Sequence, residues 1–524
     1  MRITKKLTIV TIWILLVVFL SIGGTYEAVA APCTTTLIPG NDIQTAINGA
    51  DPGDVICLNP GNYFPQSKIN VSESVTLQGP QAGVDPRPSA GTTRTPGDSI
   101  SEAIIDGSSV GTSGIMVITA DNVILDGLQV RNGSSDLIDS EEAVPTAGTI
   151  LRYNIIDTAT SDEAIQLRNV DSGVIEYNYI FDVAQDGINM CCESTGGTIQ
   201  FNEVNNSSSE NAAIYVYEST DMLIQCNLVY NVTVNDGIKL GSKGGGDAAL
   251  TGGSIIGNVV HDTKQDGITV YMSDTVVDSN EVYNSSSENG GIYLAWEIEN
   301  ITVTKNFVHD NTLSTIKPFD PGGITVGERV NAATVHVNNN NITDNWPNGV
   351  TNLVLETLDA KNNWWGAADG PGGVGLGSGD EVSTGVEFDP FLSEAQEIDD
   401  PCQPPGPEDV LDHFKCYSVR EIPPKYKKFV KKRIVHLEDQ FQKTKTLVKY
   451  LDLICIPVDK NDELIKNPEN FILNLYSIRD LHKCGRGRFK KRVVKVTDQF
   501  GEKRLKVIRE KFLAVPATKE EVAP

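Results

Sequence analysis

Hydrophobic and polar residues alternate along the middle of the chain in a phrase that repeats. In residues 265–294, Ile268 and Val270 alternate with polar neighbours, a second apolar pair leads to Asn280, and the phrase then restarts at Ile292. The repeated isoleucines are Ile188, Ile214, Ile238, Ile268, Ile292 and Ile324, and the repeated asparagines are Asn178, Asn202, Asn227, Asn258, Asn280 and Asn306. Successive members of each series are a few tens of residues apart, and repeats of that length are typical of a solenoid whose turns pack only on their neighbours. Period-two alternation indicates strands. We therefore predict a right-handed parallel β-helix with three strands per coil.

The repeated asparagines suit an amide ladder. Coils in such a solenoid lie about 4.8 Å apart, so the side chain of one asparagine can reach the turn and the asparagine of the next coil. We expect a structural role for these residues.

The start of the solenoid reads as a cap. Ile43, Ile47 and Ala50 have helical spacing, and a turn at 51–54 leads into an apolar strand at 55–58. A helix here would cover strand edges that otherwise invite pairing with other chains. Cys33 and Cys57 flank the cap, and we predict that they form a disulfide.

The N-terminal segment, 1–30, predicts export. Two lysines precede an apolar run at 7–22, and Ala28-Val29-Ala30 provides a small-residue cleavage site before Ala31. A cleaved signal peptide places the protein outside the cell or at its envelope, with no membrane span in the mature chain. An uncleaved membrane anchor is the alternative.

Charge divides the mature chain in two. Residues 31–408 carry 13 Lys and Arg against 52 Asp and Glu, whereas residues 409–524 carry 27 against 16. A proline-rich linker at 396–409 coincides with this break. We predict a β-helix domain at 31–395 and a small basic, all-β module at 410–524.

The basic module is a tandem duplication with a constant offset, and its copies span about 413–462 and 472–521. Cys416 of the first copy becomes Leu475 in the second, and Cys455 becomes Ala514. Joint loss of both cysteines predicts that Cys416 and Cys455 are bonded to each other. The other cysteines stay open: Cys191 and Cys192 could pair with each other or one could reach Cys226, and Cys484 could reach Cys402.

Motifs at both ends of the solenoid resemble a known family. The phrase IQTAINGADPGDVICLNPGNY resembles the N-terminal cap of pectate-lyase-like β-helix proteins, and NNWWG at 362–366, followed by a Gly-Pro and a final DPFL, resembles their last coil. Trp364 and Trp365 would then close the end of the core, or else provide a sugar-stacking platform. The C-terminal half, with HFKCY, DQF and PVDKN, resembles an uncharacterised secreted β module.

One neighbourhood has residues suited to chemistry. Asp236 and Asp266 occupy the same position in successive coils, and Lys239 should point outward from the same strand as Asp236. An aspartate pair with one lysine could bind Ca²⁺, the one cofactor suggested by this sequence, and abstract a proton. The alternative is that Asp-Gly makes the tight turn before each strand. The paired aspartates, Gly-His-Gly and Arg-Ile-Lys of polygalacturonases are absent, as is the Asp-Pro-His-Asp of alginate epimerases.

We therefore expect a non-catalytic secreted or envelope-associated protein that presents a surface to carbohydrate or to the cell envelope. A polysaccharide lyase, hydrolase or epimerase at Asp236, Lys239 and Asp266 is the alternative. Basic clusters at 425–433 and 483–492 suggest that the C-terminal module contacts an anionic surface. Nucleic acid is a weak option for an exported protein.

Overall fold

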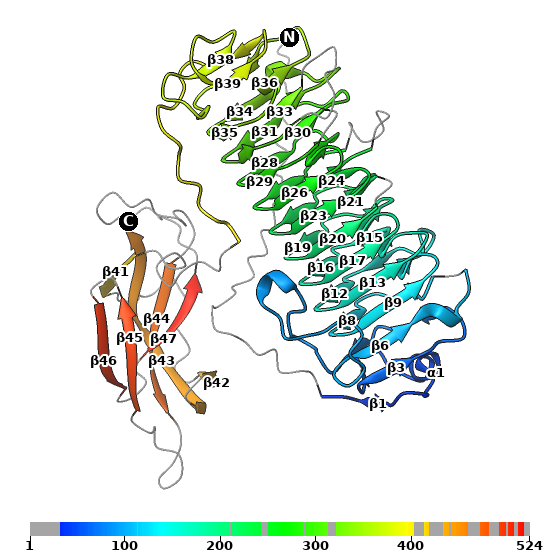
Figure 1. Ribbon diagram of the computed structural model, residues 1–524. Coiled ribbons are helices and arrows are strands. Elements are labelled where there is room, and N and C mark those ends of the chain that lie inside the picture. Colours follow the sequence, from blue (N-terminus) through cyan, green and yellow to red (C-terminus); the bar gives the residue numbers. More distant parts are fainter. Residues whose placement is uncertain are drawn as a thin grey trace, which may run out of the picture. The chain divides into compact units, whose positions relative to one another are not determined.

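The structure is a computed structural model that describes residues 32–402, apart from residue 113 and segments 209–210, 243–249, 287–288 and 313–320 (Figure 1). Beyond residue 402 it describes the backbone of seven strands. The chain divides into two compact units, with the boundary between Cys402 and Gln403. Within the described residues, no helix has the length and apolar character needed to cross a membrane. The signal peptide predicted at 1–30 lies outside the described residues.

The first unit is a stack of coils whose strands form three long sheets, and all pairings are parallel. The largest, with 14 strands, consists in order of β1 (Thr35–Leu37), β2 (Val55–Leu58), β5 (Thr76–Gln78), β8 (Ile124–Asp126), β12 (Ile150–Arg152), β16 (Val174–Glu176), β19 (Thr198–Gln200), β22 (Leu223–Gln225), β25 (Ser254–Ile256), β28 (Val276–Asp278), β31 (Ile301–Thr304), β34 (Val335–Asn338), β37 (Leu358–Asp359) and β40 (Val386–Glu387). The 13-stranded sheet consists in order of β4 (Ile69–Val71), β7 (Met116–Ile118), β10 (Ile138–Ser140), β14 (Ile165–Arg168), β18 (Ile188–Cys191), β21 (Ala212–Val216), β24 (Asp236–Leu240), β27 (Ile268–Val270), β30 (Gly290–Leu294), β33 (Gly322–Val326), β36 (Asn348–Asn352), β39 (Gly379–Val382) and β38 (Pro371–Gly373). The 11-stranded sheet consists in order of β3 (Gly61–Tyr63), β6 (Ala103–Asp106), β9 (Gln129–Gly133), β13 (Ile155–Ala159), β17 (Tyr179–Val183), β20 (Glu203–Ser207), β23 (Leu228–Val232), β26 (Val259–Thr263), β29 (Glu281–Tyr283), β32 (Phe307–His309) and β35 (Asn341–Thr343). The described part of this unit also contains a short pair of strands, β11 (Thr146–Ala147) and β15 (Val170–Asp171), and 3₁₀ turns at Pro88–Ala90, Gly107–Ser109 and Ala332–Thr334.

The predicted isoleucine repeat is the core of the stack. Ile188, Ile214, Ile238, Ile268, Ile292 and Ile324 are in register on successive strands of the 13-stranded sheet and are fully buried. Burial of such a side chain contributes about 1.5–3 kcal/mol, so each added coil extends one continuous apolar column. The prediction of an all-β parallel helix with three strands per coil is confirmed.

The predicted asparagine ladder is also present. Asn202 shows the pattern: its backbone N–H and its Nδ2 donate to Oδ1 of Asn227 at 2.9 and 3.0 Å, and the same Nδ2 donates to the carbonyl of Ile175. The ladder runs through Asn154, Asn178, Asn202, Asn227, Asn258, Asn280, Asn306, Asn340 and Asn363. All nine side chains are buried. Because these amides are used within the ladder, they are not available as ligands.

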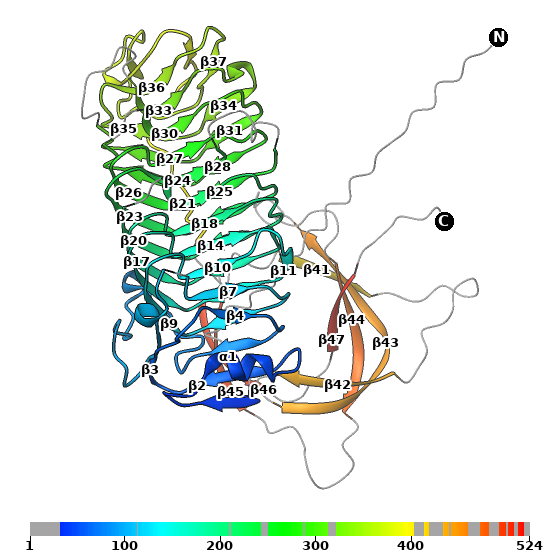
Figure 2. The same cartoon turned by 90° about the vertical axis from the view of Figure 1, so that its right-hand side faces the viewer.

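A short helix and a disulfide close the N-terminal end, as predicted. Helix α1 (Ile43–Asn48) begins at Asp42, whose side chain accepts a hydrogen bond from the N–H of Gln44, and it buries Ile43 and Ile47 against the core. It lies over the first coils at that end (Figure 2). Cys33 and Cys57 are bonded, with an S–S distance of 1.98 Å.

Trp365 closes the other end of the stack, and the chain then continues as a segment without strands, residues 396–402, which we call the strap. Trp365 is completely buried in the core. The chain after β40 has no further strand before Cys402, which is bonded to Cys226. The suggested pairing of Cys484 with Cys402 is therefore wrong, because Cys402 is already bonded inside the β-helix unit. Cys484 itself lies outside the described residues.

The strap also bears on the predicted linker. Gln396 exchanges hydrogen bonds with Asn341, so the segment from 396 to 402 is attached to the coils at both ends. Residues 403–409 of the predicted linker lie outside the described residues.

Cys191 and Cys192, whose pairing was left open by the sequence, form a disulfide with each other, although they are adjacent in the chain.

The second unit is antiparallel and repeats with the same offset as its sequence. Its strands are β41 (His413–Ser418), β42 (Arg433–Asp439), β43 (Gln442–Val458), β44 (Ile472–Asp480), β45 (Arg492–Asp498), β46 (Gly501–Val507) and β47 (Phe512–Ala517). The starts of β44, β45 and β46 follow those of β41, β42 and β43 by one constant interval, which is the offset of the sequence duplication. The first three strands form one sheet with β44 and β47, and β45 and β46 form a hairpin.

The register places the two cysteines of the first copy opposite each other. Cys416 of β41 pairs with Cys455 of β43, and the equivalent pair of the second copy is Leu475 with Ala514. Directly opposed residues of antiparallel strands have Cα atoms about 4.5–5.5 Å apart, within the range that a disulfide spans. The Cys416–Cys455 bond remains a prediction, and labelling of either thiol in unreduced protein would contradict it.

Candidate functional site

The outer face of the 13-stranded sheet carries polar and aromatic side chains in one row along the coils. This row follows the buried isoleucines by one residue and therefore points away from the core. Its members are Asp139, Gln166, Asn189, Tyr215, Lys239, Thr269 and Tyr293. A second row lies two residues before the isoleucines, at the turn into each strand, and contains Asp136, Glu163, Asp186, Asp236 and Asp266. We call this second row the acidic row.

The structure brings the three residues of the predicted site together. Lys239 Nζ lies 3.7 Å from Asp236 Oδ2, and the backbone N–H of Asp266 donates to Asp236 Oδ1 at 3.1 Å. The lysine ammonium lies over the rings of Tyr215 and Tyr271, 5.5 and 5.6 Å from their centroids. Its side chain is 14% exposed. Lys239 is thus a cation held between two aromatic rings on the outside of the sheet.

Asp266, however, is fully engaged in joining two coils. Oδ1 accepts the backbone N–H groups of Asn289 and Gly290, both at 3.2 Å. Oδ2 accepts Asn289 Nδ2 at 3.0 Å and Thr269 Oγ1 at 3.4 Å. Four hydrogen bonds fill the lone-pair positions of a carboxylate. A metal ion or a substrate proton at Asp266 would have to displace these bonds.

Asp186 accepts the same set of four hydrogen bonds as Asp266, so the arrangement recurs along the stack. Its Oδ1 accepts the N–H groups of Asn211 and Ala212, and its Oδ2 accepts the side chains of Asn211 and Asn189. The donors occupy the same positions relative to Asp186 as those around Asp266. The structural interpretation, in which the aspartate holds the turn before each strand, therefore describes Asp266 well. A role of Asp266 as a metal ligand stays a prediction.

Asp236 is the titratable member of the predicted site. Burial, followed by the charge of Asp266, raises the pKa of Asp236 to about 7, and Lys239 acts in the opposite direction. Tyr271 packs against the same group, and burial with the charge of Asp236 raises its pKa as well. Asp236 is therefore poised between its neutral and charged forms near neutral pH.

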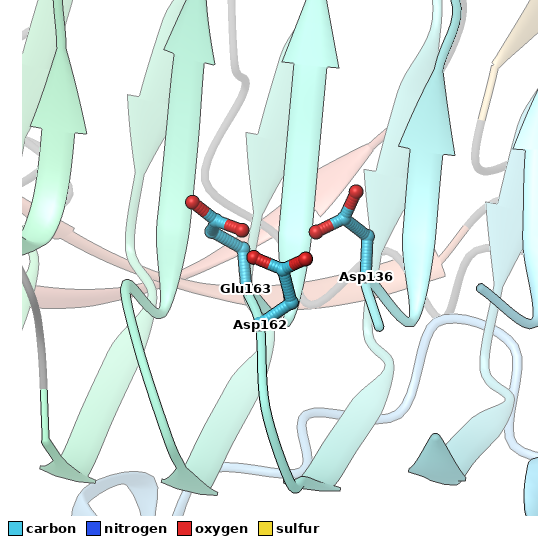
Figure 3. Close-up of side chains that lie close together, drawn as sticks. All are labelled: Asp136, Asp162 and Glu163. Carbon is cyan, nitrogen blue, oxygen red and sulfur yellow. The ribbon is translucent and has the colours of Figure 1, made fainter. Parts of the chain in front are cut away.

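The structure also assembles a carboxylate cluster that was not recognised from the sequence. One oxygen from each of Asp136, Asp162 and Glu163 lies within 4.8 Å of the others (Figure 3). Asp136 belongs to the coil that enters β10, and Asp162 and Glu163 to the next coil, which enters β14. Asp136 and Glu163 are buried and Asp162 is half-buried. The signal available in the sequence was the acidic row, because Asp136 and Glu163 each precede an inward isoleucine by two residues.

The hydrogen bonds of this cluster are incomplete. Asp136 Oδ1 is buried without any partner. Asp136 Oδ2 lies 3.4 Å from Arg168 Nη2, and Asp162 Oδ2 accepts Ser135 Oγ at 3.4 Å. Side-chain bonds of 3.3–3.4 Å are also found at Asp186 and Asp266, so the feature that distinguishes the cluster is the buried oxygen without a partner. The cluster therefore differs from the saturated carboxylates of Asp186 and Asp266.

Its electrostatics reflect the crowding of like charges. Burial, and then the neighbouring carboxyl groups of Asp162 and Asp136, raises the pKa of Glu163 to about 10. Burial also raises the pKa of Asp136. Asp139 lies beside the cluster with its pKa raised to about 6 by burial, and it takes the strongest bond of Arg168, at 2.6 Å. Arg168 is thus shared between two aspartates.

The two tryptophans of the last coil and a pair of histidines on the 11-stranded sheet also have defined positions. Trp365 is buried, so it has no face for a sugar, and Trp364 is half-buried. His261 and His309 do not form a dyad, because the ring of Tyr283 stacks between them at 4.7 and 4.9 Å. In the column formed by His261, Tyr283 and His309 the ring faces stack on one another, so the ring edges face outward.

Two family models match parts of the first unit. The family model described as "Right handed beta helix region" matches residues 192–364. The first unit is a right-handed β-helix. A second model, "Protein of unknown function (DUF1565)", matches residues 33–240 of the β-helix. A comparison with curated proteins finds no match.

Several solved structures share the coiled architecture of the β-helix. The A-module of the mannuronan C-5 epimerase AlgE4 from Azotobacter vinelandii has 13% identity and a TM-score of 0.46, with 65% of this chain and 90% of that chain covered. Pectate lyase Pel9A has 13% identity and a TM-score of 0.37, with 58% and 80% covered. The family 28 exopolygalacturonase of Yersinia enterocolitica has 15% identity and a TM-score of 0.41, with 68% and 78% covered. At such identities and TM-scores these similarities carry no information about activity.

Proposed function

We propose that the β-helix binds a polysaccharide of a cell surface or extracellular matrix along the outer face of its 13-stranded sheet, without cleaving it. The observation that carries this proposal is the position of Lys239 between the rings of Tyr215 and Tyr271. The two rings are themselves buried and hold the ammonium group in place, so the contact with a polymer would be made by Lys239 and the acidic groups of the sugar.

The spacing of the sheet suits a polymer. Strands of neighbouring coils lie about 4.8 Å apart, so the row that contains Lys239 continues along the stack in equal steps. Arg168 lies three coils away, on β14, and its side chain is also partly exposed. The two cations are therefore separated by about 14 Å along the stack. A chain of sugars could contact both.

The hydrogen bonds of the aspartates favour binding over catalysis. Hydrolysis of a glycosidic bond requires two carboxyl groups that are free to act as acid and as base or nucleophile. Asp266 is saturated by four bonds within the protein. This leaves Asp236 without an available carboxylate partner on the neighbouring coil.

One observation favours the catalytic alternative. Asp236 has a pKa of about 7 and lies beside Lys239, and a general acid or base works best when its pKa is close to the working pH. A lyase or epimerase acting through Asp236 and Lys239 is therefore the second candidate. Such an enzyme would give unsaturated or epimerised products from an acidic polysaccharide.

A panel of polysaccharides separates these functions. Retention of the full chain would be measured on acidic and neutral glycans, with and without Ca²⁺, together with reducing ends and ultraviolet absorbance of the products. We expect retention without products, and a roughly tenfold loss of affinity in Lys239→Ala, equivalent to about 1.4 kcal/mol. Lys264→Ala, which removes an exposed lysine from a turn of the same stack, is the matched control.

Two outcomes would count against this proposal. Product formation that is lost in Lys239→Ala would establish the catalytic alternative. Failure of every glycan and cell-wall fraction to retain the protein would remove carbohydrate binding altogether.

We also propose that the protein works outside the cytoplasm and that its basic module attaches it to an anionic polymer. Three disulfides in the β-helix unit support an oxidising compartment. The basic clusters at 425–433 and 483–492 lie almost entirely outside the described residues, so attachment rests on their charge in the sequence. Replacing Lys490, Lys491 and Arg492 with Gln in the full chain should weaken retention on an anionic polymer. Unchanged retention would contradict this role.

A further inference from the structure

The carboxylate cluster of Asp136, Asp162 and Glu163 has a buried oxygen with no donor. The side chain of Asp136 is 8% exposed, and its Oδ1 has no hydrogen-bond partner. Figure 3 shows that this carboxyl group faces those of Asp162 and Glu163. A buried acceptor without a donor costs about 1–3 kcal/mol or more when it is charged, so the arrangement needs a positive partner at this point.

The charges of the surrounding side chains do not supply that partner. Four carboxyl groups meet here when Asp139 is included, and the only ion pairs among the described residues around them are those that Arg168 makes with Asp136 and Asp139. Lys68 also acts on Asp139 through its charge. Two cations against four carboxyl groups leave an excess of two negative charges when all four are ionised. A divalent cation would balance them. Without an ion the raised pKa of Glu163 keeps that group neutral, so binding of a cation would release its proton.

The positions of the oxygens match one ion. A Ca²⁺ ion holds oxygen ligands at about 2.3–2.6 Å, so oxygens bound to the same ion can be up to about 5 Å apart. The three carboxyl oxygens lie within 4.8 Å of one another. Ca²⁺ accepts an irregular set of six to eight oxygens and can complete it with water, for which the half-buried Asp162 leaves access. Mg²⁺ requires a stricter octahedron and gives up its water reluctantly.

From this geometry we infer that Asp136, Asp162 and Glu163 form a Ca²⁺ site. The ion cross-links two successive coils, because Asp136 comes from one coil and the other two ligands from the next. The site is distinct from Asp236 and Asp266, which lie several coils away. It does not depend on polysaccharide binding and is tested without any glycan.

The test is calorimetric titration of CaCl₂ into the full chain after removal of metal with a chelator. We expect saturable binding with a dissociation constant on the order of 10⁻⁴–10⁻³ M or tighter, as in extracellular Ca²⁺ modules. Glu163→Gln and Asp162→Asn should each weaken this binding at least tenfold. Asp182→Asn is the matched control, because it removes an exposed carboxylate outside the cluster and should leave binding unchanged.

Folding of each variant is checked by circular dichroism with chelator present. If Glu163→Gln does not fold, Asp162→Asn decides, since that side chain is half-buried and Asn retains its size. Absence of saturable Ca²⁺ binding in the wild-type protein would overturn the inference. Equal affinity in the wild type and in the folded variants would overturn it as well, because the ion would then lie elsewhere.

Discussion

Two groups of acidic residues on one sheet have opposite surroundings. Asp186 and Asp266 each accept four hydrogen bonds, whereas Asp136 retains a buried oxygen with no donor. All three occupy the acidic row, two residues before an inward isoleucine. Their position in the coil is therefore the same, and the donors around them differ.

The donors around these aspartates come from two places, the same strand and the next coil. Three residues after Asp186 and Asp266 come Asn189 and Thr269, which donate, whereas Asp139 follows Asp136 at that position. The next coil brings an Asn with a small residue beside Asp186 and Asp266, but brings Asp162 and Glu163 beside Asp136. A carboxylate with donors on both sides joins coils by itself. A carboxylate among carboxylates requires an ion.

The largest expected effect comes from removing a saturated aspartate. Asp266→Ala would remove the carboxylate that accepts bonds from the backbone N–H groups of Asn289 and Gly290 and from the side chains of Asn289 and Thr269. We expect a loss of about 4 kcal/mol in the free energy of unfolding, measured by urea titration, at the lower end of about 1–3 kcal/mol for each of the four donors. If Asp266→Ala were as stable as the wild type, these bonds would not be what joins the coils.

A smaller effect is expected from the pH dependence of Asp236. Its pKa of about 7 in the folded protein lies above the unfolded value of about 3.9, so the folded state binds a proton that the unfolded state releases. Stability should therefore fall as pH rises from about 4 to about 7, by on the order of 2–4 kcal/mol. The groups facing Asp236 are Lys239 on its own strand and, from the next coil, Asp266, Thr269 and Tyr271.

Asp236→Asn tests this contribution. The amide oxygen can still accept the N–H of Asp266, but it does not titrate, so the variant should lose less stability across this pH range than the wild type. Unfolding by urea at about pH 5 and about pH 8 measures the difference. Parallel pH curves for the two proteins would exclude Asp236 as the source.

The smallest effect is expected from Glu163→Gln, and its sign should depend on Ca²⁺. In chelator the variant removes one carboxyl group from a crowded, buried cluster and should be more stable by about 1 kcal/mol. In millimolar Ca²⁺ the wild type gains binding free energy that the variant lacks, so the order should reverse. Thermal unfolding in chelator and in Ca²⁺ measures whether the order of the two stabilities reverses. A variant that ranks the same with and without Ca²⁺ would separate the cluster from metal binding.

The repeating part of the fold could be predicted from the sequence because each coil repeats the same demands. Ile268 and its equivalents must be apolar to fill the core, and Asn280 and its equivalents must be amides to bond at both ends, so both positions leave a visible period. The cap helix and the Cys33–Cys57 bond were also predictable, because helical spacing and two flanking cysteines are local signals.

The remaining features depend on contacts whose signals are not local. The residue before each ladder asparagine is left-handed, yet it is Tyr153, Phe201 or Lys305 as readily as a glycine, so no residue type marks this corner. Cys226 and Cys402 are far apart in the chain and are bonded because the strap runs back along the stack, which no spacing rule predicts. The Asp136 cluster requires knowledge of which residues of two coils face each other.

A crystal structure of the full chain grown with millimolar CaCl₂ tests the central comparison most directly. We predict ion density bound by carboxyl oxygens of Asp136, Asp162 and Glu163 at about 2.3–2.6 Å, with none at Asp236 and Asp266. An ion between Asp236 and Asp266, or no ion in the carboxylate cluster at saturating Ca²⁺, would contradict the account.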